Sequence, residues 1–419
     1  MKSKFDRIDR RNFLKAVGAG GLGSVLALSR LKADPNELST ADPDIAKKAK
    51  EPEFPQVPRR KLGKTGVEVS CLALGGTFNF VENQILLRKA LQWGVNYWDT
   101  ANMYAGGNSE IGIGRLLAKN PDIREKLFIV SKASGAESIS DVEERLSTSL
   151  KRMNTDYIDL YFGVHGLTDP AAELTDELRQ WAESAKKRKL IRFFGFSTDT
   201  NMAQCLAGAA KHDWIDAIMT IYNYRLMQNP EMQDAVGACH KAGIGLVAMK
   251  TQAAEEKVET ETDKKLTEHF VQRGFTAAQA KIKVVLDDKR ISSACVGMKS
   301  IAILTSNVAA VLDKTKLTQT DRNVFREYAE ATCSGYCAGC AYICSAALPE
   351  VPYINKIMRY LMYYNSYGDR NEARELFAQQ IPAEVRKRLL SVDYRPAEAC
   401  CPQSLPIGKL VSEAVSKLA

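Results

Sequence analysis

The sequence predicts an α/β protein: a (β/α)8 barrel, the TIM-barrel fold, followed by a small helical lobe that is rich in cysteine. Three observations support this fold class. From Arg59 onward, short runs of β-branched and aromatic residues alternate with amphipathic helical segments. Eight such runs are present, which is the number of strands in a closed barrel of this kind. Six of the ten cysteines lie after residue 330.

The expected elements follow one another in a regular order. A β-hairpin is predicted around residues 60–70, ahead of the barrel. Helices between the strands include residues 141–153, where Asp141 is placed to act as the N-cap, and residues 171–189. A doubly wound parallel sheet is the alternative, because it uses the same alternation. The expected barrel strands are residues 69–75, 95–101, 127–133, 157–165, 191–197, 217–223, 245–250 and 292–297.

The length and composition allow one large core. The chain has 419 residues, of which 45% are hydrophobic and 26% are charged, as expected for a barrel built from a single domain. We expect four parts: a signal segment, a linker, the barrel and the cysteine-rich lobe. Their predicted ranges are residues 1–33, 34–58, 59–330 and 331–419.

The first 33 residues are expected to be an export signal and no part of the fold. Residues 10–15 read Arg-Arg-Asn-Phe-Leu-Lys and precede a short apolar run, residues 16–28. This order resembles a twin-arginine signal, which implies passage through the twin-arginine translocase. We therefore expect the protein in the periplasm, or attached to the outer face of the cytoplasmic membrane. The apolar run is shorter than the roughly 20 residues that a membrane span requires.

The glycines of this segment do not predict a dinucleotide site. Residues 18–23 match the G-x-G-x-x-G pattern, but no β-rich run precedes them, and the fingerprint has to join a strand to a helix. Asp42 and Asp44 lie near the spacing of a ribose ligand, yet in a polar, proline-rich stretch. The export signal is therefore the preferred interpretation.

The net charge of +8 does not indicate a nucleic-acid partner. Residues 1–33 hold eight basic and two acidic residues, which leaves 50 basic and 48 acidic residues elsewhere. A nucleic-acid-binding protein would carry a concentrated basic surface on its folded part.

Four chemically active side chains fall at adjacent predicted strand ends. Asp99 ends the second strand and Tyr104 follows it, Lys132 ends the third strand, and His165 ends the fourth. The C-terminal strand ends form the active face of such a barrel, so these residues together suggest proton transfer. A nearby ammonium favours phenolate, so we expect Lys132 to lower the pKa of Tyr104 and Asp99 to hold Lys132 charged.

These residues and their surroundings resemble the aldo/keto reductase superfamily over about residues 59–313. The resemblance rests on "YWDTANMYAGGNSEIGIGRLL", "FIVSKAS", "DYIDLYFGVHG" and "GFSTDT". It implies a catalytic tetrad of Asp99, Tyr104, Lys132 and His165. In that family hydride passes between a nicotinamide cofactor and a carbonyl carbon, while the Tyr acts as general acid and the His orients the carbonyl oxygen.

The resemblance also implies an NADP(H) or NAD(H) site at the barrel mouth. The family pattern places the carboxamide at Ser197 and the adenosine phosphate on the stretch "GMKSIAILTSN", residues 297–307. Three departures from the pattern are Thr198, Met219 and Ile303, and the missing Arg at Ile303 leaves the preference for a 2′-phosphate open. The expected cofactor-binding residues are Ser197, Lys250, Gly297, Lys299, Ser300 and Asn307, although Lys250 could equally lie on the rim.

The spacing before His165 departs from the family by one residue. His165 follows Asp159 by six residues where the family has five. Strand side chains alternate between faces, so one extra residue would turn His165 away from the site. A β-bulge restores the direction, and Gly163 is suited to one. The sequence therefore predicts a bulge or an early strand exit at Gly163.

The cysteines of the lobe suggest a metal centre. The order Cys333-x3-Cys337-x2-Cys340-x3-Cys344 resembles ferredoxin cluster loops, and "YLMYYNSYGDRNEARELFAQ" resembles the lobe of aldo/keto reductases that end in a ferredoxin-like domain. We expect one [4Fe-4S] cluster on these four cysteines. Structural zinc and disulfides are the alternatives, and a role for Cys400 or Cys401 stays open.

The sequence thus predicts an NAD(P)-dependent aldo/keto reductase acting on a small carbonyl or alcohol substrate. The alternatives are an electron-transfer protein with a redox cluster and a redox partner, and a non-catalytic nucleotide-binding scaffold. Export separates the enzyme from the cytoplasmic pool of reduced nucleotide. We therefore expect the nucleotide to bind during folding and to stay bound.

Overall fold

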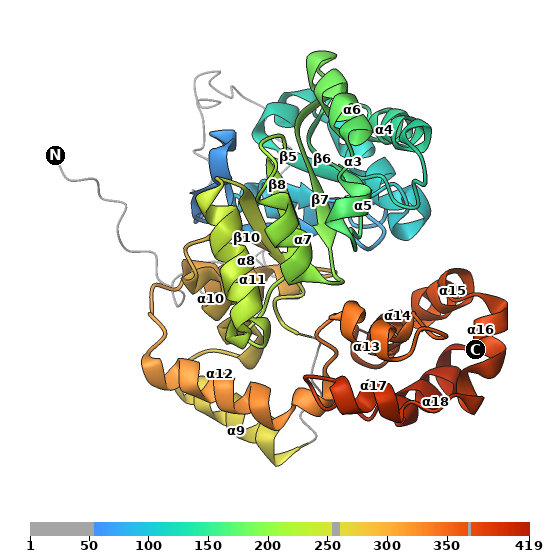
Figure 1. The fold of residues 1–419 in the computed structure, drawn as a ribbon. Coiled ribbons are helices and arrows are strands. Elements are labelled where there is room, and N and C mark those ends of the chain that lie inside the picture. Colours follow the sequence, from blue (N-terminus) through green and yellow to red (C-terminus); the bar gives the residue numbers. More distant parts are fainter. Residues whose placement is uncertain (1–53, 254–259, 368–369) are drawn as a thin grey trace, which may run out of the picture.

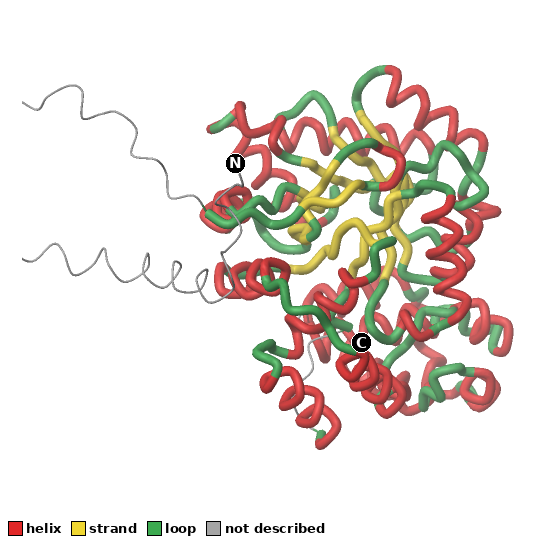
Figure 2. The backbone as a smooth tube through the Cα atoms, turned by 90° about the vertical axis from the view of Figure 1, so that its left-hand side faces the viewer, coloured by secondary structure: helices red, strands yellow, loops and turns green. Residues whose placement is uncertain are grey.

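The computed structural model describes residues 54–253, 260–367 and 370–419, so the predicted signal and most of the linker lie outside the described residues. Eight parallel strands form a closed barrel in the order β10-β3-β4-β5-β6-β7-β8-β9. Figure 2 shows the strands at the centre with helices around them. The predicted (β/α)8 barrel is confirmed. The strands are β3 Leu72–Gly75, β4 Tyr97–Asp99, β5 Phe128–Lys132, β6 Ile158–His165, β7 Ile191–Thr198, β8 Ala217–Ile221, β9 Gly245–Met249 and β10 Ile291–Gly297.

Helices cover the outer face of the barrel (Figure 1). They bury an apolar face against the strands, as amphipathic helices of this fold do. In the described part of the chain, none of the helices has both the length and the apolar character needed to cross a membrane. The helices that precede the C-terminal lobe are α2 Gln84–Gln92, α3 Asn108–Lys119, α4 Ile139–Met153, α5 Pro170–Glu173, α6 Asp176–Lys187, α7 Met202–Ala209, α8 Pro230–Lys241, α9 Glu261–Gln272, α10 Ala277–Asp287, α11 Ile301–Leu312 and α12 Gln319–Ala331.

The predicted hairpin closes the N-terminal end of the barrel. Its strands are β1 Arg59–Lys61 and β2 Glu68–Ser70, and the side chains of Leu62 and Val69 are fully buried in the barrel interior. The predicted strand 69–75 is therefore two strands, because residues 69–70 pair within the hairpin and only residues 72–75 join the barrel. With this end filled by apolar side chains, the C-terminal end is left for the site.

Helix α4 begins before the predicted start. Ser138 is the N-cap and accepts a hydrogen bond from the Asp141 backbone N–H, while the Asp141 carboxylate accepts one from the Ser138 N–H. Asp141 is thus the third residue of a capping box, and its prediction as the N-cap was wrong by three positions. The predicted helix 171–189 is also divided, because a break at residues 174–175 separates α5 from α6.

The bulge predicted at Gly163 is confirmed. Phe162 pairs with Gly195 and Val164 with Phe196, so Gly163 is the extra residue in β6. A Cβ atom on Gly163 would lie 2.5 Å from the ring of Phe194, which explains why glycine stands here. His165 is thereby returned to the same side of the barrel as Tyr104.

The C-terminal lobe is a helical unit with its own apolar core, and it lies beside the barrel in Figure 1. Backbone contacts attach it to the loop after β7: the Asn201 N–H donates to the Gly339 carbonyl over 2.8 Å. Gly339 has φ +80°, and a Cβ atom there would lie 2.8 Å from the Asp199 carbonyl oxygen. The lobe contains α13 Ala341–Ala347, α14 Ile354–Met362, a π-helical turn Tyr363–Tyr367, α15 Arg370–Gln380, α16 Ala383–Arg388, α17 Arg395–Cys400 and α18 Ile407–Leu418.

Candidate active site

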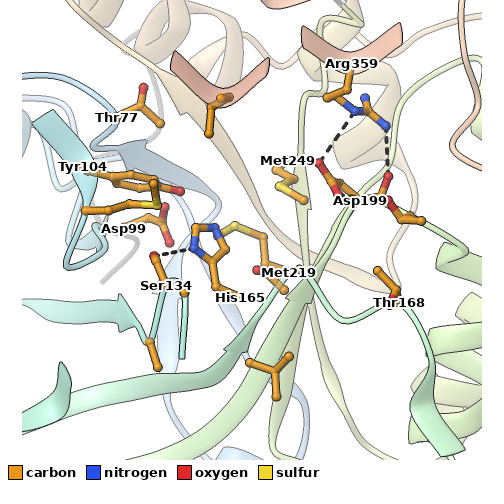
Figure 3. A pocket seen from close by; sticks show the side chains of 18 of the residues that line it. Thr77, Asp99, Tyr104, Ser134, His165, Thr168, Asp199, Met219, Met249 and Arg359 are labelled. Carbon is orange, nitrogen blue, oxygen red and sulfur yellow. Dashed lines mark hydrogen bonds and ion pairs between the residues drawn. The ribbon is translucent and has the colours of Figure 1, made fainter. Parts of the chain in front are cut away.

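The four polar residues predicted at the strand ends come together at the barrel mouth. Asp99 ends β4, Lys132 ends β5 and His165 ends β6, while Tyr104 opens a 3-10 turn after β4. The Lys132 ammonium donates to Asp99 Oδ2 and to the Thr100 carbonyl, both over 2.7 Å. The ammonium nitrogen lies 4.6 Å from the centre of the Tyr104 ring, whose edge meets the His165 ring at a centroid distance of 6.0 Å. Figure 3 shows Tyr104, Asp99 and His165 around one cavity.

Burial keeps the phenol and the imidazole of this group uncharged. Burial raises the pKa of Tyr104 well above 10, and the nearby Asp99 carboxylate raises it further. Burial also lowers the pKa of His165 to about 3, helped by the Lys132 charge. The expectation that Lys132 lowers the pKa of Tyr104 was therefore wrong. The ammonium is neutralised by Asp99 at 2.7 Å and lies over the ring face, where a cation is attracted by the π electrons.

The Asp99 carboxylate forms an ion pair with Lys132. Burial raises its pKa, and the charge of Lys132 opposes that rise. Its second oxygen, Oδ1, is buried and has no hydrogen-bond partner among the described residues. A buried ion pair of this kind is costly to break, because the remaining partner becomes an isolated charge.

Ser134 contacts His165 and is itself held by Asn102, and neither was predicted as a site residue. Ser134 Oγ lies 2.5 Å from His165 Nδ1. The Ser134 backbone N–H donates to Asn102 Oδ1 over 2.7 Å. The only sequence signal for Ser134 is its place two residues beyond Lys132, just past a strand end of the active face.

The cavity at the mouth has a volume of about 1020 Å³ and lies between the barrel and the lobe. This is the upper end of the range for ligand pockets. The barrel side includes Asp99, Tyr104 and His165. The lobe side is formed by α14, the π-helical turn and α15, with Lys356, Arg359, Tyr360, Tyr363, Tyr367 and Leu376.

A charged network joins the lobe to the barrel at this cavity. Arg359 Nη2 donates to the Asp199 carbonyl over 2.9 Å, and Arg359 Nε lies 3.6 Å from the Asp199 carboxylate (Figure 3). Lys250 Nζ lies 3.3 Å from the same carboxylate and 2.7 Å from the Tyr363 hydroxyl. Burial would raise the pKa of Asp199, but the two cations outweigh it and hold the pKa well below its ordinary value. The sequence did not reveal this network, because Arg359 lies 160 residues from Asp199.

The predicted cofactor residues divide into two groups. Ser197, Lys250, Gly297 and Lys299 line the cavity. Ser300 instead caps α11, where its Oγ accepts from the Ile303 N–H. Asn307 is buried on α11 and does not line the cavity. Met219 and Ile303, two of the departures from the family pattern, do line it.

The structure does not support the predicted metal centre. All ten cysteines are unbridged. The described residues include no group of three or more His, Cys, Asp or Glu side chains that could hold a metal ion. Burial, with the charges of Cys337, Cys344 and Cys401 nearby, raises the pKa of Cys340 to about 12. The alternative of disulfides is not supported either, because no cysteine is bridged in this structure.

The pKa of His165 predicts an acid-sensitive fold. Unfolding restores the ordinary pKa of 6.5, so between pH 6.5 and about 3 the unfolded chain binds a proton that the folded chain does not. The free energy of unfolding is expected to fall as the pH drops through this window. Denaturant titrations of His165→Gln should show a shallower pH dependence than the wild type, whereas His240→Gln, at an exposed position on α8, should not. Equal slopes for the wild type and His165→Gln would contradict the assignment.

The geometry defines a (β/α)8-barrel protein with a polar site at the C-terminal strand ends, enclosed by a helical lobe. A model of the aldo/keto reductase family matches residues 71–329, and the chain belongs to this family. The lobe lies beyond the matched residues.

Three known proteins show the extent of the similarity. Protein tas of Escherichia coli (strain K12) is 35% identical over 232 residues, which are 45% of this chain and 66% of that protein. L-glyceraldehyde 3-phosphate reductase of Escherichia coli O157:H7 is 25% identical over 329 residues, or 65% of this chain and 93% of that protein. The solved aldo-keto reductase AKR11C1 from Bacillus halodurans has a TM-score of 0.54 at 23% identity, covering 65% of this chain and 96% of that one, and shows the fold alone. The chain spans 65% to 66% of the length of the first curated relatives that it matches.

Proposed function

We propose that this protein is a nicotinamide-dependent reductase that converts a small aldehyde, ketone or sugar carbonyl to the alcohol, or runs the reverse reaction. The observation that carries the proposal is the position of Tyr104. Its side chain lines the cavity, 6.0 Å between ring centres from His165 and 4.6 Å from the Lys132 ammonium. A tyrosine hydroxyl held in this way serves as a proton donor to a carbonyl oxygen.

The cavity fits a nicotinamide cofactor. Ser197, Gly297 and Lys299 line it, and a Cβ atom placed on Gly297 would meet nothing within 4 Å, so backbone is open to a ligand there. Lys299 offers a cation for a phosphate near the N-terminus of α11. When bound, a reduced nicotinamide supplies the hydride that the carbonyl carbon accepts.

Each residue of the tetrad then has a distinct role. Tyr104 donates its hydroxyl proton to the carbonyl oxygen during reduction and takes it back during oxidation. Lys132, held by Asp99 and the Thr100 carbonyl, lies against the face of the Tyr104 ring and fixes the position of the phenol at the cavity. His165 orients the carbonyl oxygen. Met219, where the family pattern has an amide, favours a non-catalytic nucleotide-binding scaffold as the second candidate.

The proposal is tested on the full chain with nucleotide and substrate supplied separately. NADPH and NADH are titrated by fluorescence, and the loaded protein is then mixed with aldehydes, ketones and sugars. Saturable binding followed by oxidation of the nucleotide supports a reductase. Binding without turnover of any carbonyl supports the scaffold. A protein that binds no added nucleotide and releases none on denaturation contradicts both.

The lobe is assigned no metal chemistry in this proposal. The cysteine side chains, as they lie in the described residues, do not fit a metal ion or cluster.

We also propose export by the twin-arginine route with the nucleotide already bound. The support is the sequence of residues 1–33 and the enclosure of the cavity by the lobe. Fractionation of cells should place the protein outside the cytoplasm, and protein purified from that fraction should release nucleotide on denaturation. Protein that stays in the cytoplasm, or exported protein without nucleotide, would contradict this proposal.

Arg359→Met is expected to release bound nucleotide about tenfold faster, which corresponds to about 1.4 kcal/mol. Arg359 is buried and holds α14 of the lobe against the loop after β7, so its loss opens the cover of the cavity. Stopped-flow displacement of the nucleotide measures the rate. Arg395→Met is the matched control, because that arginine is in the same lobe but exposed. Equal rates for the wild type and Arg359→Met would show that the lobe does not retain the nucleotide.

A further inference from the structure

The loop after β5 places one hydroxyl against the His165 ring. Ser134 is nearly buried, and its Oγ lies 2.5 Å from His165 Nδ1. His165 Nδ1 is the only hydrogen-bond partner of this hydroxyl among the described residues. Figure 3 shows the contact at the wall of the cavity, beside Tyr104 and Asp99.

The Ser134 backbone is fixed by the segment that carries Tyr104. Its N–H donates to Asn102 Oδ1 over 2.7 Å, and Asn102 Nδ2 donates back to its carbonyl over 3.4 Å. Asn102 is held in turn by Arg152, whose Nη1 donates to the Asn102 carbonyl over 2.6 Å. The hydroxyl is therefore positioned by the fold and is not a mobile surface group.

We propose that Ser134 is a positioning residue that donates its hydroxyl hydrogen to His165 Nδ1 and so fixes the tautomer with the hydrogen on Nε2. In this tautomer Nε2–H is left to donate a hydrogen bond to the carbonyl oxygen of the substrate. The inference rests on the proposed reductase function. It gives a residue outside the tetrad a part in orienting the substrate, through the tautomer of His165.

Two observations favour this direction of donation. The His165 ring is neutral, so only one of its nitrogens carries a hydrogen. If that nitrogen were Nδ1, the Ser134 hydroxyl hydrogen would have no acceptor among the described residues, and an unused buried donor is costly. If Nδ1 accepts, the serine hydrogen is used, and the imidazole hydrogen on Nε2 stays available to the substrate.

The chemistry of the substrate points the same way. A carbonyl oxygen only accepts hydrogen bonds, and the opposite tautomer would present it with the lone pair of Nε2. The Tyr104 hydroxyl and the His165 Nε2–H would then be two donors converging on one oxygen, which is the arrangement that stabilises the charge developing there. The hydroxyl of Ser134 selects the tautomer that allows this arrangement.

The test compares Ser134→Ala with Ser134→Thr, which keeps the donor, and with Ser345→Ala in the lobe as the matched control. We expect Ser134→Ala to lower kcat for carbonyl reduction about 5- to 150-fold, the range for one lost buried hydrogen bond. Ser134→Thr should recover most of the activity, Ser345→Ala should match the wild type, and nucleotide affinity should be unchanged in all three. An unchanged kcat in Ser134→Ala would overturn the proposal.

The second readout needs no turnover. Nitrogen NMR of histidine-labelled protein reports which ring nitrogen carries the hydrogen, and only four histidines have to be assigned, with His165→Gln identifying the signal. The wild type should show the Nε2–H form and Ser134→Ala a mixture. An Nδ1–H form in the wild type would overturn the role of Ser134. Absence of all carbonyl turnover with an Nε2–H signal would instead overturn the proposed function.

Discussion

Tyr104→Phe is expected to lose carbonyl reduction by at least about 100-fold while binding nucleotide as tightly as the wild type. The variant keeps the ring beneath the Lys132 ammonium and removes only the hydroxyl that donates the proton. General acid catalysis contributes roughly 100- to 10,000-fold, so the loss should appear in kcat and not in the affinity for nucleotide. Steady-state kinetics and a fluorescence titration on the same preparation separate the two quantities.

Tyr97→Phe is the matched control for this variant. Tyr97 lies on β4, fully buried in the barrel interior, and its hydroxyl has no hydrogen-bond partner among the described residues. Removing that hydroxyl changes the same kind of side chain on the same strand as Asp99 without touching the cavity, so turnover should persist. Equal activity of Tyr104→Phe and Tyr97→Phe would show that Tyr104 is not the proton donor.

Lys132→Met is expected to lower the free energy of unfolding by about 3–5 kcal/mol at neutral pH, because Asp99 is left as an unpaired buried charge. Without Lys132 the pKa of Asp99 rises further above its ordinary value of 3.8. Below the unfolded-state pKa of Asp99, the carboxyl costs the variant no stability. As the pH rises through the raised folded-state pKa, the free energy of unfolding of the variant falls. Denaturant titrations at several pH values should show a deficit that shrinks in acid.

The double variant Lys132→Met with Asp99→Asn separates charge from packing. It removes both charges of the pair, so it should recover a large part of the stability that the single variant loses, though not the activity. A single variant as stable as the wild type at neutral pH, or a double variant less stable than the single one, would contradict the buried ion pair.

The barrel could be predicted because its strands are short buried runs separated by amphipathic helices, a pattern that is local in the chain. The eight expected strands all occur. The one merged strand prediction, 69–75, arose because only Cys71 separates the hairpin strand from the barrel strand. The bulge at Gly163 was predictable for a different reason: one residue too many before His165 had to be absorbed.

The contacts of the site were less predictable because they depend on burial and on distant segments. The sequence predicted that Asp99 holds Lys132, and the two side chains form an ion pair at 2.7 Å, but it did not reveal that burial would raise the pKa of Tyr104. The lobe residues Arg359 and Tyr363 reach the cavity only after the chain folds back over the loop after β7. Likewise Cys401 approaches Cys340 through the packing of α17 on α13, which the cysteine spacing does not encode.

A single-turnover experiment on the full chain tests the central claim most directly. The protein is loaded with reduced nucleotide, mixed with an excess of small aldehyde, and the absorbance of the reduced nicotinamide is followed for the wild type, Tyr104→Phe and Tyr97→Phe. The account predicts stoichiometric oxidation of the bound nucleotide in the wild type and Tyr97→Phe, and at least about a 100-fold slower reaction in Tyr104→Phe. Oxidation at the same rate in all three proteins would contradict it.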